Sequence, residues 1–377
     1  MSRILRVAGA QMGPNQRADD RAAILARMIA MLEQAAGAGA KLVVFPELAF
    51  TTFFPRWPMD RDSPELLASF ETAMPNPAVQ PLFDRAKALG VGFYVGYAEL
   101  TPEGQRFNSA VTVGPNGDIL FKYRKIHLPG SDSVKPGQRY QQLEKMYFEY
   151  GDMGFPAKRG PAEWGAPVLG MLVCNDRRWP EGWRVLGLQG VELVMVGYNS
   201  AAYDPNGGEG ESAEMRTFHS TLATQANAYM NATWAVAVAK AGVEDGAGLI
   251  GGSCIVDPNG MVVAQAKTLG DEVILADVNS RRLPAGQGED VQLRRPSAAA
   301  VVRDDHRTGG GAGPEVRLGE KVFSPLDACV QPLIYFCKSG TLRAAAPASQ
   351  KGRVGLGEGI PVSLPNLPSL TPPGSTS

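Results

Sequence analysis

Short apolar segments and amphipathic segments alternate over the first three quarters of the chain, and this alternation restricts the fold more than any other feature of the sequence. Residues 41–50, KLVVFPELAF, form a nearly continuous apolar run, which is typical of a strand buried on both faces. Residues 19–40 instead carry Ile24, Met28 and Leu32 at helical spacing. Strands and helices in alternation predict an α/β sandwich with its helices outside the sheets.

Two segments contain a Pro-Asn-Gly turn between apolar runs, which predicts hairpins over residues 109–128 and 252–266. We interpret the two turns as shared turn chemistry rather than as a repeat that defines an array. The other predicted elements are strands over 6–13, 91–100, 167–174, 191–200 and 233–240, and helices over 76–90, 181–190 and 214–229.

The alternation ends near residue 280, where the composition changes. Residues 281–316 show no sustained period, and residues 359–377 are rich in Pro, Ser and Gly. Such a segment buries too little apolar surface to order itself. We therefore predict a folded domain over residues 1–280 and a divergent, largely disordered extension over residues 281–377.

Charge and cysteine content argue against several classes of protein. The net charge is −1, without a dense Lys/Arg block, which gives no reason to expect a nucleic-acid partner. No run approaches the ~20 apolar residues that span a bilayer, so we expect no membrane association. The four cysteines form no CxxC pair, which predicts neither a zinc site nor a disulfide framework. A reducing, cytoplasmic setting with a free thiol fits this pattern best.

Polar residues of three kinds follow three of the predicted strands. Glu47 follows LVVFP, Lys125 follows ILFKYR, and Cys174 follows GMLV. Ligands gather at the carboxyl ends of strands in α/β sheets, where a carboxylate, an ammonium and a thiol would supply a base, a cation for a developing oxyanion and a nucleophile. Taken singly, each has a simpler explanation, because a buried cysteine is often inert and a Glu or Lys at a strand end often faces water.

Three segments around these residues resemble the Glu-Lys-Cys signature of the nitrilase superfamily of carbon–nitrogen hydrolases: FPELAFTTFFPRW, KYRKIHLPG and CNDRRWPEGWRVLGLQG. The likeness runs from Arg6 to about Val278, in the expected order. Within that superfamily the segments are most similar to N-carbamoyl-D-amino acid amidohydrolases, because Asn-Asp-Arg-Arg begins directly after the cysteine. The resemblance implies the fold of the superfamily, a four-layer α-β-β-α sandwich.

The resemblance also implies a mechanism that uses neither metal nor cofactor. Glu47 is expected to take the proton of Cys174, whose thiolate attacks the ureido carbonyl. A thiol with a pKa of about 8.5 is too protonated to act well without such a base. Lys125 is expected to stabilise the oxyanion, and Glu144 to orient Lys125 and the substrate. The products would be a D-amino acid, carbon dioxide and ammonia, formed through a carbamoyl-thioester.

The expected small-molecule substrate, an N-carbamoyl amino acid, carries a carboxylate, and two arginines follow the nucleophile. A guanidinium binds a carboxylate in a planar, two-pronged way and stays charged. Arg177 or Arg178 is therefore the expected partner of the substrate carboxylate. The alternative is that both arginines pair structurally with Asp176 and Glu181.

The resemblance adds further residues to the expected substrate-binding group. Asn175 and Asn199 are expected to line the site. His127 and His219 fall where the amidohydrolases have histidines, and we expect them to be hydrogen-bonded supports of the site rather than bases. Gln142 departs from that pattern, which commonly has a histidine two residues before the second glutamate. A glutamine still donates and accepts hydrogen bonds but carries no charge.

Two longer segments also depart from the amidohydrolase pattern. Residues 200–218 form a Gly-rich, acidic loop that would border the pocket and alter specificity. Beyond residue 280 the chain shows nothing like the aromatic, basic segment that relatives pack across a subunit interface. A homodimer or homotetramer is still the expected assembly.

Two alternatives to the amidohydrolase stay open. One is another carbon–nitrogen hydrolase, such as a β-ureidopropionase or an amidase. The other is a catalytically silent scaffold on the same fold, which the intact Glu47, Lys125 and Cys174 argue against. Preference for the D enantiomer rests on the resemblance alone.

Overall fold

The computed structural model describes residues 4–204, 206, 210–279, 317–318 and 321–322. The chain divides into two units, Met1–Ala312 and Gly313–Ser377. In the second unit, β15 (Arg317–Leu318) and β16 (Lys321–Val322) pair antiparallel. The rest of the predicted extension over 281–377 lies outside the described residues, so its boundary and its disorder stay predictions.

The first sheet of the first unit has six strands in the order β14-β1-β2-β3-β4-β5. The pairs β1–β2 and β2–β3 are parallel, and the other pairs are antiparallel. The first Pro-Asn-Gly turn joins β4 to β5, as predicted. The strands are β1 (Ile4–Gln11), β2 (Leu42–Val44), β3 (Gly92–Leu100), β4 (Arg106–Val113), β5 (Ile119–Arg124) and β14 (Glu272–Asn279).

The second sheet has six strands in the order β13-β12-β9-β8-β7-β6. From β6 to β13, its succession of parallel and antiparallel pairs is the same as that of the first sheet from β14 to β5. The two predicted hairpins therefore occupy corresponding edges of the two sheets. The strands are β6 (Ala157–Arg159), β7 (Val168–Val173), β8 (Leu193–Tyr198), β9 (Trp234–Ala239), β12 (Cys254–Val256) and β13 (Val262–Gln265); a ribbon of β10 (Ala241–Glu244) and β11 (Ala247–Ile250) follows β9.

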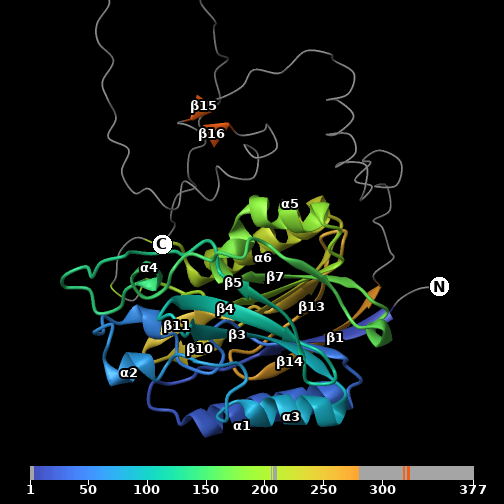
Figure 1. The fold of residues 1–377 in the computed structure, drawn as a ribbon, viewed down its shortest axis with the longest axis horizontal. Helices are drawn as coiled ribbons and strands as arrows, with labels where there is room; N and C mark the ends of the chain where they lie inside the picture. The colour runs from blue at the N-terminus through green and yellow to red at the C-terminus, as the bar shows by residue number, and fades with distance from the viewer. Residues whose placement is uncertain (1–3, 205, 207–209, 280–316, 319–320, 323–377) are drawn as a thin grey trace, which may run out of the picture. The chain divides into compact units, whose positions relative to one another are not determined.

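Helices cover the outer face of each sheet, and Figure 1 shows α1 and α3 below the sheets and α5 and α6 above them. Successive residues of one strand pack on opposite faces of the sheet. In β1, Ala8 packs in the core between the first sheet and helices α1 and α3, whereas Val7 packs in the core between the two sheets. This is the predicted α-β-β-α sandwich. The helices are α1 (Arg21–Gly37), α2 (Pro64–Leu67), α3 (Gln80–Leu89), α4 (Glu144–Tyr147), α5 (Pro180–Leu188) and α6 (Ala213–Met230), with 3-10 helices η1 (Phe54–Arg56), η2 (Ala162–Trp164) and η3 (Cys174–Arg178).

Local signals explain where several elements begin and end. Asp20 precedes α1 with an extended backbone, although its side chain makes no capping hydrogen bond. α3 ends at Gly90, whose φ of 63° lies in the left-handed region that favours glycine. The predictions omitted β6, β10 and β11, which have only three or four residues each, and the edge strand β14.

Candidate active site

The segment that follows β2 carries Glu47 into the space between the two sheets. Glu47 is fully buried, and the next residue, Leu48, has a left-handed φ of 46°. Glycines on the facing strands leave room for this segment. A Cβ on Gly96 would lie 2.7 Å from Glu47 Cα, and a Cβ on Gly197 would lie 2.7 Å from Glu47 N. Any side chain at either position would therefore displace the backbone of Glu47.

Lys125 lies within hydrogen-bond distance of two carboxylates. Its Nζ is 2.8 Å from Glu47 Oε1 and 2.5 Å from Glu144 Oε2, and all three side chains are buried. Asn108, in β4, donates from Nδ2 to the same two oxygens at 2.8 Å and 3.2 Å. The structure thus brings the predicted Glu47, Lys125 and Glu144 together and adds Asn108.

Burial and mutual charge shift the pKa values of this cluster. Burial lowers the pKa of Lys125, but its charge interactions with Cys174, Glu144 and Glu47 outweigh this effect and raise the pKa well above its usual value. Burial raises the pKa of Glu144 to about 7, against the opposing effect of Lys125. Glu144 therefore changes protonation near neutral pH, whereas Lys125 stays an ammonium.

Cys174 begins η3 directly after β7. Its φ of 49° lies in the left-handed region, which is strained for a residue with a side chain. The residue is 6% exposed, and its Sγ donates to Asn199 O at 3.2 Å. Burial, reinforced by the carboxylate of Glu47, raises the pKa of the thiol to about 12. The resting side chain is a neutral thiol, which needs a base to become a nucleophile.

Asn199, at the end of β8, connects Cys174 with Glu47. Its backbone N–H donates to Glu47 Oε2 at 3.0 Å, and its Nδ2 donates to Glu47 O at 2.9 Å, while its carbonyl accepts the thiol. The thiol and the carboxylate make no hydrogen bond with each other. Asn199 Oδ1 is buried and has no hydrogen-bond partner within the described part of the chain, so it is an acceptor available to a ligand.

Asp176 fixes η3 to the segment that carries Lys125. Its buried carboxylate accepts hydrogen bonds from Val173 N at 3.1 Å, from Tyr123 Oη at 2.8 Å and from His127 N at 2.9 Å. The His127 ring lies beside it, with Nδ1 2.8 Å from Asp176 Oδ1. One carboxylate therefore joins the end of β7 to the end of β5, which sets where Lys125 lies relative to η3.

The two arginines after Cys174 have different surroundings. Arg177 is fully buried; its guanidinium donates to Cys174 O at 2.7 Å and to Ser220 Oγ at 3.0 Å, and it lies 4.1 Å over the ring of Tyr198. Arg178 lines a cavity and has no hydrogen-bond or ion-pair partner among the residues that the structure describes. Burial and the adjacent Arg177 lower the pKa of Arg178. Of the two, Arg178 is the one available to a carboxylate.

The alternative in which Arg177 and Arg178 pair with Asp176 and Glu181 is wrong. The carboxylate of Asp176 is already surrounded by the donors from the ends of β5 and β7. No ion pair joins either arginine to Glu181 in the structure. The sequence could not separate these cases, because the direction of each arginine depends on the short 3-10 turn between them.

The other predicted substrate-binding residues form two groups. Asn175 and Asn199 line the cavity, as expected. His127 and His219 do not line it. His127 is held by Asp176, and His219 is 44% exposed with its Nδ1 2.8 Å from Glu211 Oε1. The structure therefore does not place the two histidines with the substrate-binding residues. The His219 side chain points outward from α6, and the His127 ring is hydrogen-bonded to Asp176 of η3.

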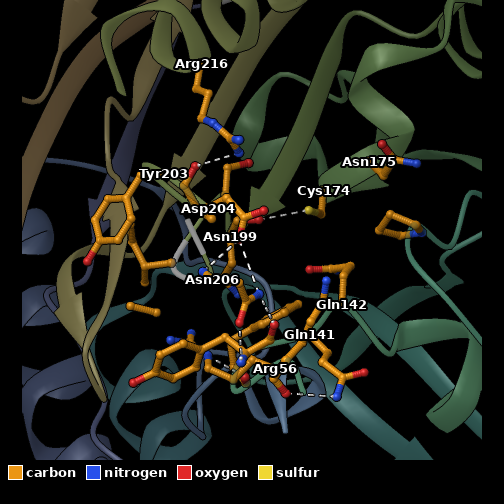
Figure 2. Close-up of a pocket in the computed structure, with 18 of the residues that line it drawn as sticks. Arg56, Gln141, Gln142, Cys174, Asn175, Asn199, Tyr203, Asp204, Asn206 and Arg216 are labelled. Carbon is orange, nitrogen blue, oxygen red and sulfur yellow. Dashed lines mark hydrogen bonds between the residues drawn. The ribbon is translucent and has the colours of Figure 1, made fainter. Parts of the chain in front are cut away.

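Cys174 opens into a cavity of about 440 Å³, which Figure 2 shows. Cationic side chains outnumber acidic ones on its wall. The charged lining residues are Arg56, Lys135, Arg177, Arg178, Arg216 and Asp204. Arg56 pairs with the buried Glu244, whose Oε1 is 2.7 Å from Arg56 Nη2 and whose Oε2 is 2.8 Å from Lys240 Nζ. The remaining excess of positive charge favours an anionic ligand.

Sequence reasoning missed Asn108 and Arg216. Every residue of β4 is buried, so an asparagine within it was a usable signal, because a buried amide needs hydrogen-bond partners. Arg216 reaches the cavity from α6, and its place at the end of the unusual 200–218 loop was its only signal. Gln142 also lines the cavity and donates from Nε2 to Glu144 Oε1 at 2.8 Å.

No group of three His, Cys, Asp or Glu side chains is placed to hold a metal ion within the described ranges. In the same ranges, no helix has both the length and the apolar character needed to cross a membrane. Cys174 and Cys254 are buried free thiols, and Cys329 and Cys337 lie outside the described residues.

The carbon-nitrogen hydrolase family matches residues 6–285 of the chain. A protein named nitrilase from Pyrococcus abyssi is 29% identical over 279 residues, which cover 73% of this chain and 90% of that protein. An (R)-stereoselective amidase from Pseudomonas sp is 30% identical over 253 residues, which cover 66% of this chain and 77% of the amidase.

Solved structures show the same fold. An amidase from Nesterenkonia sp. has a TM-score of 0.58 and 24% identity, over 74% of this chain and 91% of the amidase. A carbon-nitrogen hydrolase from Helicobacter pylori G27 has a TM-score of 0.61 and 21% identity, over 82% of this chain and 96% of that chain. The family match covers the strands that carry Glu47, Lys125 and Cys174. The chain therefore belongs to the carbon-nitrogen hydrolase family, in the nitrilase superfamily, and is a hydrolase that acts on carbon–nitrogen bonds.

Proposed function

We propose that the protein hydrolyses N-carbamoyl-D-amino acids to the D-amino acid, carbon dioxide and ammonia, with Cys174 as the nucleophile. The observation that carries the choice of an acidic substrate is the cationic wall beside Cys174, where Arg178 has no carboxylate partner among the described residues. A hydrolase of neutral amides would have no use for an unpaired guanidinium next to its nucleophile. The preference for the D enantiomer is supported by the sequence resemblance alone.

In the first half of the reaction, Glu47 takes the proton of the Cys174 thiol and the thiolate adds to the ureido carbonyl carbon. The ammonium of Lys125 and a backbone N–H beside Cys174 stabilise the oxyanion that forms. Glu47 returns the proton to the terminal nitrogen, the carbon–nitrogen bond breaks, and ammonia leaves. The substrate is then held as a thioester on Cys174.

In the second half, Glu47 takes a proton from water, whose oxygen attacks the thioester carbon. The carbon–sulfur bond breaks and the thiol regains its proton. The product that leaves is an N-carboxy amino acid, which loses carbon dioxide to give the free amino acid. Through both halves, the anionic Glu144 and Asn108 keep Lys125 and Glu47 in place.

Two lining residues fit the substrate at opposite ends. The Oδ1 of Asn199, a residue whose backbone oxygen accepts the thiol, has no partner among the described residues and can accept an N–H of the ureido group. The guanidinium of Arg178 can bind the α-carboxylate, and Asn175 lines the cavity between Cys174 and Arg178 along η3. This arrangement fixes the ureido carbon at a set distance from the carboxylate.

The test is a panel of D- and L-N-carbamoyl amino acids, β-ureidopropionate and neutral amides, assayed for ammonia release by the wild type and Arg178→Gln. We expect Arg178→Gln to raise KM for the carbamoyl amino acids about 10- to 100-fold, the effect of losing a charge-assisted hydrogen bond, and to change neutral amides little. Arg184→Gln, an exposed arginine of α5 outside the cavity, is the matched control. Release from neutral amides or β-ureidopropionate alone would favour another carbon–nitrogen hydrolase, and no release at all would favour a silent scaffold.

We also propose a homo-oligomer in a reducing, cytoplasmic setting. Large apolar side chains on α5 and α6 are exposed, among them Leu188 at 50%, Phe218 at 56% and Leu222 at 46%. Such side chains gathered on neighbouring helices are typical of a surface that a second copy of the chain covers. The reducing setting keeps the Cys174 thiol available. Sedimentation of the wild type against Phe218→Ser tests the assembly.

A further inference from the structure

Four cationic side chains line the cavity without a carboxylate partner in the part of the chain that the structure describes: Lys135, Arg177, Arg178 and Arg216. The acidic side chain among the described lining residues is Asp204, whose Oδ1 accepts the Asn206 N–H at 2.9 Å. Asp204 and one substrate carboxylate together supply two negative charges against these four cations. A substrate with a single negative charge therefore leaves two cations of the wall unmatched.

Apart from the fully buried Arg177, Arg216 is the cation of this group that hydrogen bonds hold in a fixed position. Its Nε donates to Glu211 O at 3.1 Å, and its Nη1 donates to Ala201 O at 3.4 Å. Both acceptors are neutral backbone oxygens, and the carboxylate of Glu211 is directed instead to His219. Figure 2 shows the Arg216 side chain extending from α6 towards Asp204 and Asn199. The guanidinium is thus oriented but not neutralised, and its Nη2 has no acceptor among the described residues.

Arg178 and Arg216 reach the cavity from different elements. Arg178 is the last residue of η3, next to the nucleophile, whereas Arg216 belongs to α6. Two guanidiniums in one cavity repel each other, and anionic groups bound at both would remove that repulsion. A guanidinium also binds a carboxylate more specifically than an ammonium does, which favours Arg216 over Lys135 for this role.

We propose that Arg216 forms a second anion-binding subsite, and that the preferred substrates are N-carbamoyl derivatives of acidic amino acids. The α-carboxylate binds Arg178 and the side-chain carboxylate binds Arg216. This inference rests on the proposed function and adds the side-chain preference to it. Arg216 is a specificity-determining residue, because it distinguishes substrates without contacting the reacting carbon.

The test compares kcat/KM for N-carbamoyl-D-glutamate with kcat/KM for N-carbamoyl-D-glutamine, two substrates that differ in one carboxylate. For the wild type we expect the glutamate derivative to be preferred about tenfold or more, since a charge-assisted hydrogen bond distinguishes the two. Arg216→Gln should reduce this ratio to about one, and Arg216→Lys should restore part of it. Arg184→Gln, outside the cavity, should keep the wild-type ratio.

Three outcomes would overturn the inference. A wild-type ratio near one, with the glutamine derivative hydrolysed, would reject the second subsite and leave the proposed function standing. If Arg216→Gln left the ratio unchanged and Lys135→Gln reduced it to about one, the subsite would belong to Lys135, and its assignment to Arg216 would be wrong. Ammonia release from neither derivative, nor from any other carbamoyl amino acid, would reject the inference and the proposed function together. Circular dichroism of each variant separates loss of the fold from loss of the subsite.

Discussion

The thiol of Cys174 donates a hydrogen bond to the backbone carbonyl of Asn199, 3.2 Å away, and not to a carboxylate. The N–H of the same residue, Asn199, binds the carboxylate of Glu47 at 3.0 Å. In the resting state, Asn199 therefore lies between the nucleophile and its proposed base and contacts both. Because burial raises the pKa of the thiol to about 12, the thiolate must form only when substrate is bound and Glu47 takes the proton.

Replacing Cys174 should abolish turnover and leave the fold intact. We expect Cys174→Ala to reduce kcat to the level of a buffer blank, because no other side chain of the cavity can form the thioester. Cys254→Ala is the matched control: this second buried thiol lies in the core at β12, so its loss should lower Tm while kcat is largely kept. Ammonia release measures kcat, and activity surviving in Cys174→Ala would refute the assignment.

Replacing Asp176 should lower kcat much more than it raises KM. Asp176→Asn keeps the shape of the side chain but turns an N–H group towards donors such as Tyr123 Oη and Val173 N. Each unsatisfied donor costs about 1–3 kcal/mol, so Tm should fall, and the ends of β5 and β7 should separate. We expect kcat to fall roughly tenfold or more, because Lys125 is then displaced from the oxyanion.

The control for Asp176 is Glu181→Gln, an exposed carboxylate in the first turn of α5. This variant should have the kcat, KM and Tm of the wild type. If Asp176→Asn lowered Tm but left kcat unchanged, its role would be structural only. Steady-state kinetics and thermal melts of both variants decide the question.

The site residues that sequence reasoning placed at strand ends, where the structure also has them, are those whose signal is local. Glu47 and Cys174 each follow a short apolar run, and Lys125 follows the second strand of a predicted hairpin, so their place at a strand end can be inferred from neighbouring residues. The two Pro-Asn-Gly hairpins are local in the same sense: Asp257 Oδ1 accepts the Asn259 N–H at 2.9 Å within one of the turns. Such features need no knowledge of which strands are neighbours.

The residues that it missed or misplaced depend on contacts between distant segments. Asn108 acts on Glu47 only because β4 lies near β2 in the sheet. His219 and Ser220 are adjacent in sequence, but successive residues of a helix point about 100° apart, so Ser220 contacts Arg177 inside while His219 faces out. No periodicity in α6 indicates which of the two faces inward.

Gly197 should be intolerant of even the smallest side chain. A Cβ at this position would lie 2.7 Å from Glu47 N and 2.7 Å from Pro46 C, both backbone atoms that cannot rotate away. We expect Gly197→Ala to displace Glu47 and to lower kcat at least tenfold, since small misplacement of a catalytic group is costly. Gly37→Ala is the control, because a Cβ there meets nothing within 4 Å. Wild-type kcat in Gly197→Ala would show that the segment after β2 can move without consequence.

Activity should rise with pH through the pKa of Glu144, which burial raises to about 7. Below this pH Glu144 is neutral and Lys125 loses one of its two anionic partners; above it the carboxylate is charged and Lys125 is held. Gln142 Nε2 donates to Glu144 Oε1 and so favours the charged form. Gln142→Leu should therefore raise the pKa and move the acid limb of kcat/KM to higher pH by about one unit, the effect of one charge-assisted hydrogen bond. Gln141→Leu is the control, because the Gln141 amide binds Lys135 and Gln138 backbone oxygens and no carboxylate. An acid limb that both variants leave in place would mean that Glu144 is not the group that titrates.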